Sequence, residues 1–395
     1  MIKKSSDDDV LDLAISLQFL KIPTLSGVFR HIISMLSAAS RQVATDRGPK
    51  GQTMKRVAYS LILAAGLAST SAMAADMAVK APPAAAAPAS PWDFVITAAL
   101  MNDYNFRGVS QSNHKPSTQA GYELRYNSTP SLQWYGGVSG ESIDFPNDAA
   151  AEIDFYAGVR PTFDKLALDF GGWYYWYPGG QCYGFPGGGA SGCADSGGGS
   201  LPFPGGSFVP GTGAFGPLGG NEVLKNVSFW EVYGKATYTF NDQWAAGVQE
   251  WYSPSVLNSG AWGAFSTGNV TWTAPSTMLQ NGLGMYISGD LGYWDLGTSN
   301  IFYAVPASPA GVKYTSYATW DLGLGFTYKV LTLDLRYIDT NLSKGQCNVF
   351  TSAQNATFSP SNVSAQNPNG LGTNWCSAAF VAKLSASIDF ASNLK

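Results

Sequence analysis

The sequence is poor in charged residues, in histidine and in long apolar runs. Charged side chains make up only 13% of the 395 residues, and the two histidines are His31 and His114. So few histidines leave little for acid–base or metal chemistry. No apolar run of about eighteen residues follows the N-terminal region, which argues against a helical membrane protein. We therefore expect no metal, no cofactor and no enzymatic activity.

Glycine and aromatic residues, by contrast, are abundant. The chain has 45 glycines, and aromatic residues account for 13% of it. Its length would allow two soluble domains, but this composition is unusual for such a protein. From Ala75 onward there are 14 Lys and Arg residues against 22 Asp and Glu residues, so the net charge of this part is 14 − 22 = −8. Nucleic acid is therefore not an expected partner.

An export signal begins inside the chain, at MKRVAYSLILAAGLASTSAMA. Lys55 and Arg56 precede an apolar run, and Ala72 and Ala74 form an A-x-A cleavage site. This pattern predicts a signal peptide over 54–74. Residues 1–53 would then be an over-extended gene prediction or a dispensable leader, although a cytosolic helix at LDLAISLQFL is the alternative. The Ala/Pro-rich stretch 75–91 is expected to form a semi-extended linker.

Four cysteines lie in the part that would be exported: Cys182, Cys193, Cys347 and Cys376. Disulfides are the default in an oxidising compartment, and four cysteines allow three pairings. We favour Cys182 with Cys193 and Cys347 with Cys376, because each pair then closes one loop. A zinc site is the alternative, but neither pair has a neighbouring histidine.

From Trp92 onward, apolar and polar residues alternate with a period of two. In FVAKLSASIDF, Leu384 and Ile388 share an apolar face, while Lys383 and Asp389 lie on the other face. This segment alone would favour a strand of a soluble sandwich. The pattern recurs, however, in segments of roughly ten residues, the length of a tilted strand that spans a bilayer. The predicted strands are 92–104, 117–127, 131–142, 152–162, 165–177, 226–240, 243–252, 269–280, 283–296, 314–329, 331–340 and 377–390.

The connections between these segments alternate in length. Short turns such as FDK and NG alternate with longer loops, the longest from about Pro178 to Lys225. Outer-membrane barrels have short periplasmic turns and long extracellular loops, whereas a Greek-key sandwich does not sort its loops in this way. We predict an all-β fold over 92–395: a transmembrane antiparallel β-barrel of about 12 strands in the outer membrane of a Gram-negative bacterium, with membrane lipid as a partner. The eighth strand is the weakest prediction, because Pro275 interrupts it.

The polar face of the strands would line the barrel interior. Acidic residues outnumber basic ones there, which would favour cations weakly. The alternative for any one of these residues is a structural salt bridge to a neighbouring strand. The candidate pore-lining residues are Asp93, Asp103, Glu123, Arg125, Asp154, Arg160, Asp169, Glu231, Lys235, Asp290, Asp321, Lys329, Asp334, Arg336, Lys383 and Asp389.

Several motifs resemble the TorF family of Gram-negative porin-like proteins. They are NDYNFRGVSQS (102–112), QAGYELRY, WYGGVSGESIDF, EIDFYAGVRPTF, WYYWYPGG and WEVYGKATYTF, which together span most of 92–390. Asn102 and Asn105 depart from the family pattern, as do two enlarged loops that carry the cysteines. The resemblance implies a barrel with a porin-like role and does not specify a solute.

The segment that follows the first strand is a candidate extracellular loop. Arg107, Gly108, Ser110, Gln111 and Ser112 could form a constriction or bind a ligand. The alternative is a structural turn, in which glycine permits tight backbone geometry and the arginine packs over the rim.

Three functions remain open. The first is a channel for passive diffusion of small hydrophilic solutes or ions. The second is a hydrolase that uses His114 with Ser110 or Ser112, although no motif supplies an acid partner. The third is a structural or adhesive barrel without an open pore. The sequence does not indicate an oligomeric state.

Overall fold

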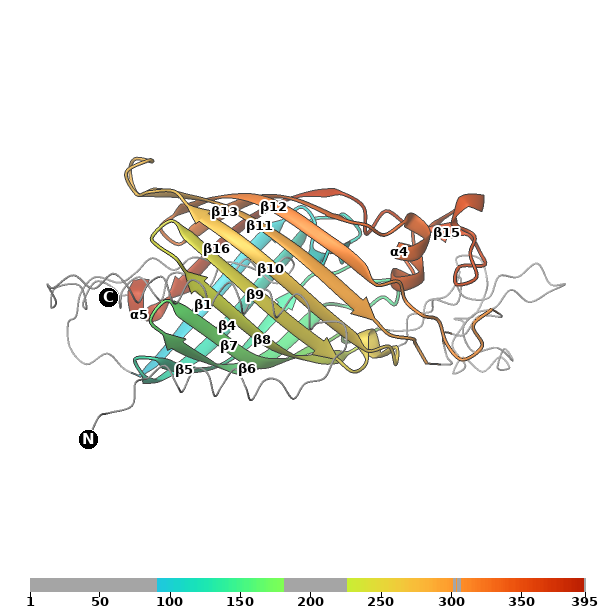
Figure 1. Cartoon of the computed structure of the whole chain (residues 1–395), viewed down its shortest axis with the longest axis horizontal. Helices are drawn as coiled ribbons and strands as arrows, with labels where there is room; N and C mark the ends of the chain where they lie inside the picture. The colour runs from blue at the N-terminus through green and yellow to red at the C-terminus, as the bar shows by residue number, and fades with distance from the viewer. Residues whose placement is uncertain (1–90, 181–225, 301–302, 304–306, 394–395) are drawn as a thin grey trace, which may run out of the picture. The chain divides into compact units, whose positions relative to one another are not determined.

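In the computed structural model, the described residues are 91–180, 226–300, 303 and 307–393. Within them, twelve antiparallel strands close into a barrel, because β16 pairs with both β13 and β1 (Figure 1). The barrel strands are β1 (Trp92–Met101), β4 (Ser117–Thr129), β5 (Leu132–Glu141), β6 (Glu152–Phe163), β7 (Leu166–Trp176), β8 (Phe229–Thr239), β9 (Trp244–Ser253), β10 (Gly263–Thr273), β11 (Leu283–Leu296), β12 (Tyr317–Tyr328), β13 (Leu331–Thr340) and β16 (Ala379–Asp389).

The predicted fold class is confirmed, but several strand bounds are wrong, above all those of the eighth strand. The eighth strand is Gly263–Thr273 rather than 269–280. Pro275 has no amide hydrogen to donate to a neighbouring strand and lies in the turn after it. The first strand ends at Met101 rather than at 104, because the chain turns away from the barrel wall there. The predicted extension 1–53, signal peptide 54–74 and all but the last residue of the linker 75–91 lie outside the described residues.

Connections sort by length between the two ends of the barrel. Short turns join β4 to β5, β6 to β7, β8 to β9 and β12 to β13 at one end, which is the periplasmic end. The other end carries the longer loops, with β2 (Asn105–Phe106), β3 (Val109–Ser110), η3 (Val256–Asn258), α4 (Lys344–Thr351), β14 (Thr357–Phe358), η5 (Pro360–Asn362) and β15 (Leu371–Gly372). In Figure 1, α4 and β15 lie at the end opposite α5 (Phe390–Asn393).

Two short helices flank the last strand. Phe390 of α5 stacks on Phe94 of β1 with ring centroids 3.6 Å apart, at the end where the short turns lie. The helix α4 begins at a capping box between Ser343 and Gln346, in the loop that precedes β16. None of the described helices is long and apolar enough to cross a membrane.

The barrel is apolar outside and polar inside. On β16, Leu384 is 47% exposed on the outer face, whereas Asp389 is only 7% exposed on the inner face. The same alternation leaves large apolar side chains exposed on every barrel strand. Because closure leaves no unpaired strand edge, this surface fits hydrocarbon. The protein is a β-barrel of the Gram-negative outer membrane.

One predicted disulfide is confirmed. Cys347 of α4 is bonded to Cys376, which precedes β16, and the two are 29 positions apart in the sequence. Both cysteines lie in the extracellular loop between β13 and β16. The other predicted pair, Cys182 with Cys193, lies outside the described residues.

Reduction of the disulfide is expected to loosen the loop and leave the barrel folded, since the strand ladders hold the barrel together. With reductant, the folded band on a heat-modifiable gel should persist, while cleavage of 341–378 by protease should become faster. A Cys347→Ser variant should behave in the same way without reductant. Loss of the folded band in either case would contradict this expectation.

Charge on the outer face should be costly in proportion to its depth. Leu384 lies at the middle of β16 and Phe380 near its extracellular end. We expect Leu384→Arg to destabilise the barrel by about 2–4 kcal/mol and Phe380→Arg by about 0–1 kcal/mol. Urea unfolding in lipid vesicles measures both. Equal costs for the two variants would mean that this face does not cross the bilayer as assigned.

Candidate functional site

The chain leaves β1 and turns into the barrel as a two-strand hairpin. Strand β2 pairs with β3, with Phe106 opposite Val109. The two residues of the turn, Arg107 and Gly108, have φ values of +52° and +82°, as a type I′ turn requires. A Cβ atom at Gly108 would collide with the side chains of Thr340 and Thr319. The tip of the hairpin therefore lies against the wall formed by β12 and β13.

The hairpin is anchored by a buried ion pair. Arg107 Nη1 and Nη2 donate to Glu231 Oε1 and Oε2 over 2.9 and 2.6 Å, and the two residues are 2% and 1% exposed. Tyr175 donates its hydroxyl hydrogen to the same carboxylate at 3.0 Å. Tyr317 donates to the Arg107 carbonyl at 2.9 Å. These contacts connect the hairpin to β7, β8 and β12.

Aromatic rings enclose the guanidinium group. Arg107 Cζ lies 4.6 Å from the ring centroid of Phe106 and 4.5 Å from those of Phe265 and Trp294. Rings at this distance stabilise a cation through their quadrupoles. They belong to a buried apolar cluster that also includes Val109, Phe229, Trp251 and Trp375. This cluster occupies the extracellular part of the lumen.

The alternative of a structural turn holds for Gly108, whose φ is +82°, but Arg107 does not pack over the rim. Arg107, Ser110, Gln111 and Ser112 are all buried. The physical reason is the partner on β8, which lies 124 positions away in sequence and draws the guanidinium group into the lumen. The segment is a plug hairpin.

Ion pairs line the wall on the periplasmic side of this plug. Arg125 contacts Glu123 at 2.6 Å and Asp389 at 3.3 Å. Arg160 contacts Glu123 at 2.8 Å and Asp169 at 3.3 Å. This network connects β4, β6, β7 and β16, so the alternative of structural salt bridges holds for these five predicted residues.

A second network lies on the other side of the barrel. Arg336 of β13 contacts Asp334 at 3.0 Å and also pairs with Asp321 of β12. Tyr286 of β11 donates to Asp334 at 2.6 Å. Asp290 lies opposite Asp321 in the register of β11 and β12, and none of the described residues forms a hydrogen bond with its Oδ1 atom.

Three further predicted wall residues lie opposite members of these networks in the strand register: Asp93 opposite Arg125, Lys235 opposite Asp169, and Lys383 opposite Asp334. Lys235 Nζ lies 4.7 Å from the ring centroid of Tyr233 and 5.0 Å from that of Trp251. Lys383 donates to Gln119 at 2.9 Å. Asp93 accepts the amide hydrogen of Ala391 at the periplasmic end.

The prediction for Lys329 is wrong. Strand β12 ends at Tyr328, and Lys329 is an exposed residue of the following turn with a φ of +54°. The alternation of the sequence continues through this turn, which is why the pattern assigned Lys329 to the wall.

Two acidic residues of the interior were not among the candidates. Glu141 ends β5, and Glu152 begins β6 directly opposite it. Both are buried beside the predicted residue Asp154. The alternation of β6 already placed Glu152 on the polar face with Asp154, but only the strand register shows that Glu141 joins them.

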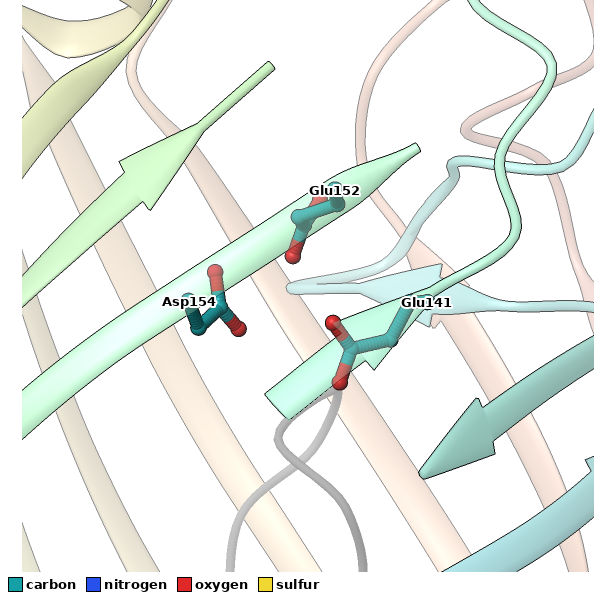
Figure 2. A group of neighbouring side chains, drawn as sticks. All are labelled: Glu141, Glu152 and Asp154. Carbon is teal, nitrogen blue, oxygen red and sulfur yellow. The ribbon is translucent and has the colours of Figure 1, made fainter. Parts of the chain in front are cut away.

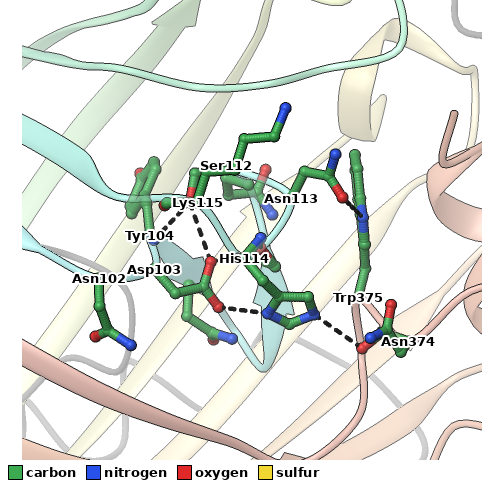
Figure 3. A network of polar contacts seen from close by, with 12 residues as sticks. Asn102, Asp103, Tyr104, Ser112, Asn113, His114, Lys115, Asn374 and Trp375 are labelled. Atoms are coloured by element: carbon green, nitrogen blue, oxygen red, sulfur yellow. Dashed lines mark hydrogen bonds and ion pairs between the residues drawn. The ribbon is translucent and has the colours of Figure 1, made fainter. Parts of the chain in front are cut away.

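A polar network ties the plug hairpin to the disulfide-bonded loop (Figure 3). His114 Nδ1 lies 2.9 Å from Asp103 Oδ2, and its Nε2 lies 3.2 Å from the carbonyl oxygen of Asn374. The Ser110 and Ser112 hydroxyls both donate to Asp103 Oδ1, at 2.6 and 3.0 Å. Asp103 is thus the acid partner that no motif supplied, but neither serine hydroxyl faces the imidazole. The arrangement lacks the nucleophile–base contact that a hydrolase needs.

Comparison with known proteins gives one family match and several similar folds. A profile of a bacterial protein family of unknown function, Gcw_chp, matches residues 85–187. No curated protein matches the chain. The NanC porin is 8% identical over 74% of this chain and 98% of that chain, with a TM-score of 0.34.

Two further solved structures are similar to the same extent. A loop-deletion mutant of OmpT, an outer membrane protein of Vibrio cholerae, is 11% identical over 76% of this chain and 100% of that chain, with a TM-score of 0.30. LpxR from Salmonella typhimurium is 7% identical over 74% of this chain and 99% of that chain, with a TM-score of 0.33. At these identities, the likenesses say nothing about function.

The network around His114 should make stability depend on pH. The hydrogen bond to Asp103 raises the pKa of His114 above its usual value. Only the protonated ring can donate to both Asp103 and the Asn374 carbonyl. The stabilisation is therefore fully present below about pH 6.5 and is lost as the pH rises through the raised pKa.

We expect the free energy of unfolding to fall over this rise, relative to a His114→Gln variant. Urea unfolding of the protein in detergent, followed by tryptophan fluorescence between pH 5.5 and pH 9, measures the difference. Parallel curves for the two proteins would show that the His114 contacts contribute nothing.

Proposed function

We propose that the protein is a narrow channel for small hydrophilic solutes or ions, gated by the plug hairpin, and that it is not an enzyme. The observation that carries this proposal is the charged inner wall, which continues on the periplasmic side of the plug hairpin. Arg125, Arg160 and Arg336 each contact two acidic residues of this wall. The resemblance to the TorF family implies the same porin-like role.

The free-energy cost of burying charge favours a channel over a barrel without an open pore in the periplasmic part of the lumen. Taking charges out of water is expensive, and well-packed apolar residues of similar volume are often equally or more stable. In a barrel with a purely structural role, these charges would serve only as salt bridges between strands. A path for polar solutes needs such a wall.

An excess of acidic residues supports a preference for cations. Within the described part of the chain, Glu141, Glu152, Asp154 and Asp290 form no salt bridge with Lys or Arg. Uncompensated carboxylates along a pore attract cations and repel anions.

The structural alternative is favoured by a different observation. The apolar cluster around Phe106, Trp251 and Trp294 occupies the extracellular part of the lumen, and these three side chains are buried. In a channel, this cluster must separate when the plug hairpin moves. In a structural barrel, it would stay closed.

Release of the plug hairpin should therefore increase conductance. The variant Arg107→Ser/Glu231→Gln removes both charges of the ion pair, because the single change would leave a buried carboxylate unpaired at a cost of about 3–5 kcal/mol. We expect its conductance in planar bilayers to rise severalfold and its reversal potential in a salt gradient to remain on the cation side.

Lys115→Ser is the matched control. It breaks the exposed pair with Asp144 in the same extracellular region, and that pair does not reach the lumen. Its conductance should equal that of the wild type. Absence of current in all three folded proteins would favour the structural barrel, and equal conductance in all three would show that the hairpin does not gate the path.

A further inference from the structure

Three carboxylates converge inside the extracellular part of the barrel, apart from the plug hairpin. Figure 2 shows the side chains of Glu141, Glu152 and Asp154 turned toward one another from β5 and β6. One oxygen atom of each lies within 4.8 Å of the others. The residues are 3%, 2% and 2% exposed, so bulk water does not screen their mutual repulsion.

Two of these carboxylates present buried oxygens that bond to nothing. Glu141 Oε1 accepts from Gln119 at 2.7 Å, and Asp154 Oδ2 accepts from Ser139 at 3.3 Å. Glu141 Oε2 and Asp154 Oδ1 have no hydrogen-bond partner among the described residues. Buried acceptors without partners are costly, and paired arrangements are the rule. Both oxygens therefore lack the positive partner that Glu123, Asp169 and Asp334 receive from arginine.

Neighbouring hydroxyls fix the third carboxylate. Tyr104 donates to Glu152 Oε1 at 2.7 Å, and Tyr177 donates to Glu152 Oε2 at 3.0 Å. Each oxygen keeps a second lone pair. Hydrogen bonds of this kind orient the carboxylate ligands of metal ions.

We propose that Glu141, Glu152 and Asp154 form a binding site for Ca²⁺. Carboxylate oxygens are the ligands of hard cations, and no sulfur or imidazole ligand joins the group. Ca²⁺ binds oxygens at 2.3–2.6 Å in a flexible geometry, so two ligands of one ion lie up to about 5.2 Å apart. Mg²⁺ demands near-ideal octahedral geometry and usually keeps several waters, so it suits a group this buried less well.

A bound ion would connect parts of the mouth that are distant in sequence. Through Glu152, it would fix Tyr104 at the base of the plug hairpin and Tyr177 at the start of the long loop after β7. The site does not depend on the proposed channel, because ion binding is measured without any current.

Calcium titration of the full chain tests the site. The protein is refolded in detergent without lipopolysaccharide, which itself binds divalent cations, and is treated with chelator before use. We expect one Ca²⁺ per chain by calorimetry, with a dissociation constant on the order of 0.1–1 mM, as in other extracellular calcium sites. Tb³⁺ should give tyrosine-sensitised luminescence through Tyr104 and Tyr177, and Ca²⁺ should quench it by displacement.

Variants that keep the side-chain size separate the site from the fold. Glu141→Gln and Asp154→Asn should each weaken Ca²⁺ binding at least about tenfold. Glu250→Gln is the control, because the Glu250 carboxylate lies on β9, accepts a hydrogen bond from Ser266 and belongs neither to the group nor to the charged wall. Its affinity should equal that of the wild type.

Heat-modifiable gels establish that each variant is folded. Absence of Ca²⁺ binding by the folded wild type up to about 10 mM, which exceeds the range of extracellular calcium sites, would overturn the proposal. Unchanged affinity in folded Glu141→Gln and Asp154→Asn would also overturn it, since the ion would then bind elsewhere.

Discussion

The buried ion pair between Arg107 and Glu231 organises the extracellular half of this barrel. A guanidinium group out of water is tolerated only where its hydrogen bonds are satisfied, and here a bidentate carboxylate and three aromatic rings satisfy it. The inward course of the chain follows from this need. Glycine fits at position 108 because this tip of the hairpin lies against Thr319 and Thr340, which leave no room for a side chain. An acidic residue on one strand thus determines the path of a loop that begins on another.

Most of the fold follows from the sequence because the membrane imposes a strict pattern. Lipid on one face and polar groups on the other force the two-residue period, and closure forces alternating loops. The predicted strand ends were wrong, because neither the lipid nor the closure of the barrel constrains the sequence there. The predicted eighth strand runs past the end of β10 to Pro275 and beyond, and at Lys329 the alternation itself continues past the end of β12. After Tyr328, the two-residue alternation of the sequence continues although β12 has ended.

The interior is less predictable than the wall. Alternation assigned Glu123, Arg160 and Asp169 to the inner face correctly, but their pairing depends on the stagger of strands. Glu141 meets Glu152 only because the register of β5 and β6 places them opposite each other. A sequence pattern states which face a residue occupies and not which residue it meets. Long-range partners such as Arg107 and Glu231, 124 positions apart, are beyond such a pattern.

The hydrogen bonds of the plug hairpin bear on the order in which the molecule assembles. Ser110 donates its amide to the Trp375 carbonyl, and His114 contacts Asn374, so the first loop of the barrel is held by the last one. These segments are neighbours because β1 pairs with β16, the seam between the two ends of the sheet. The contacts between the plug hairpin and the last loop are therefore complete only when β1 pairs with β16. A nascent barrel has an open mouth until its final strand is in place.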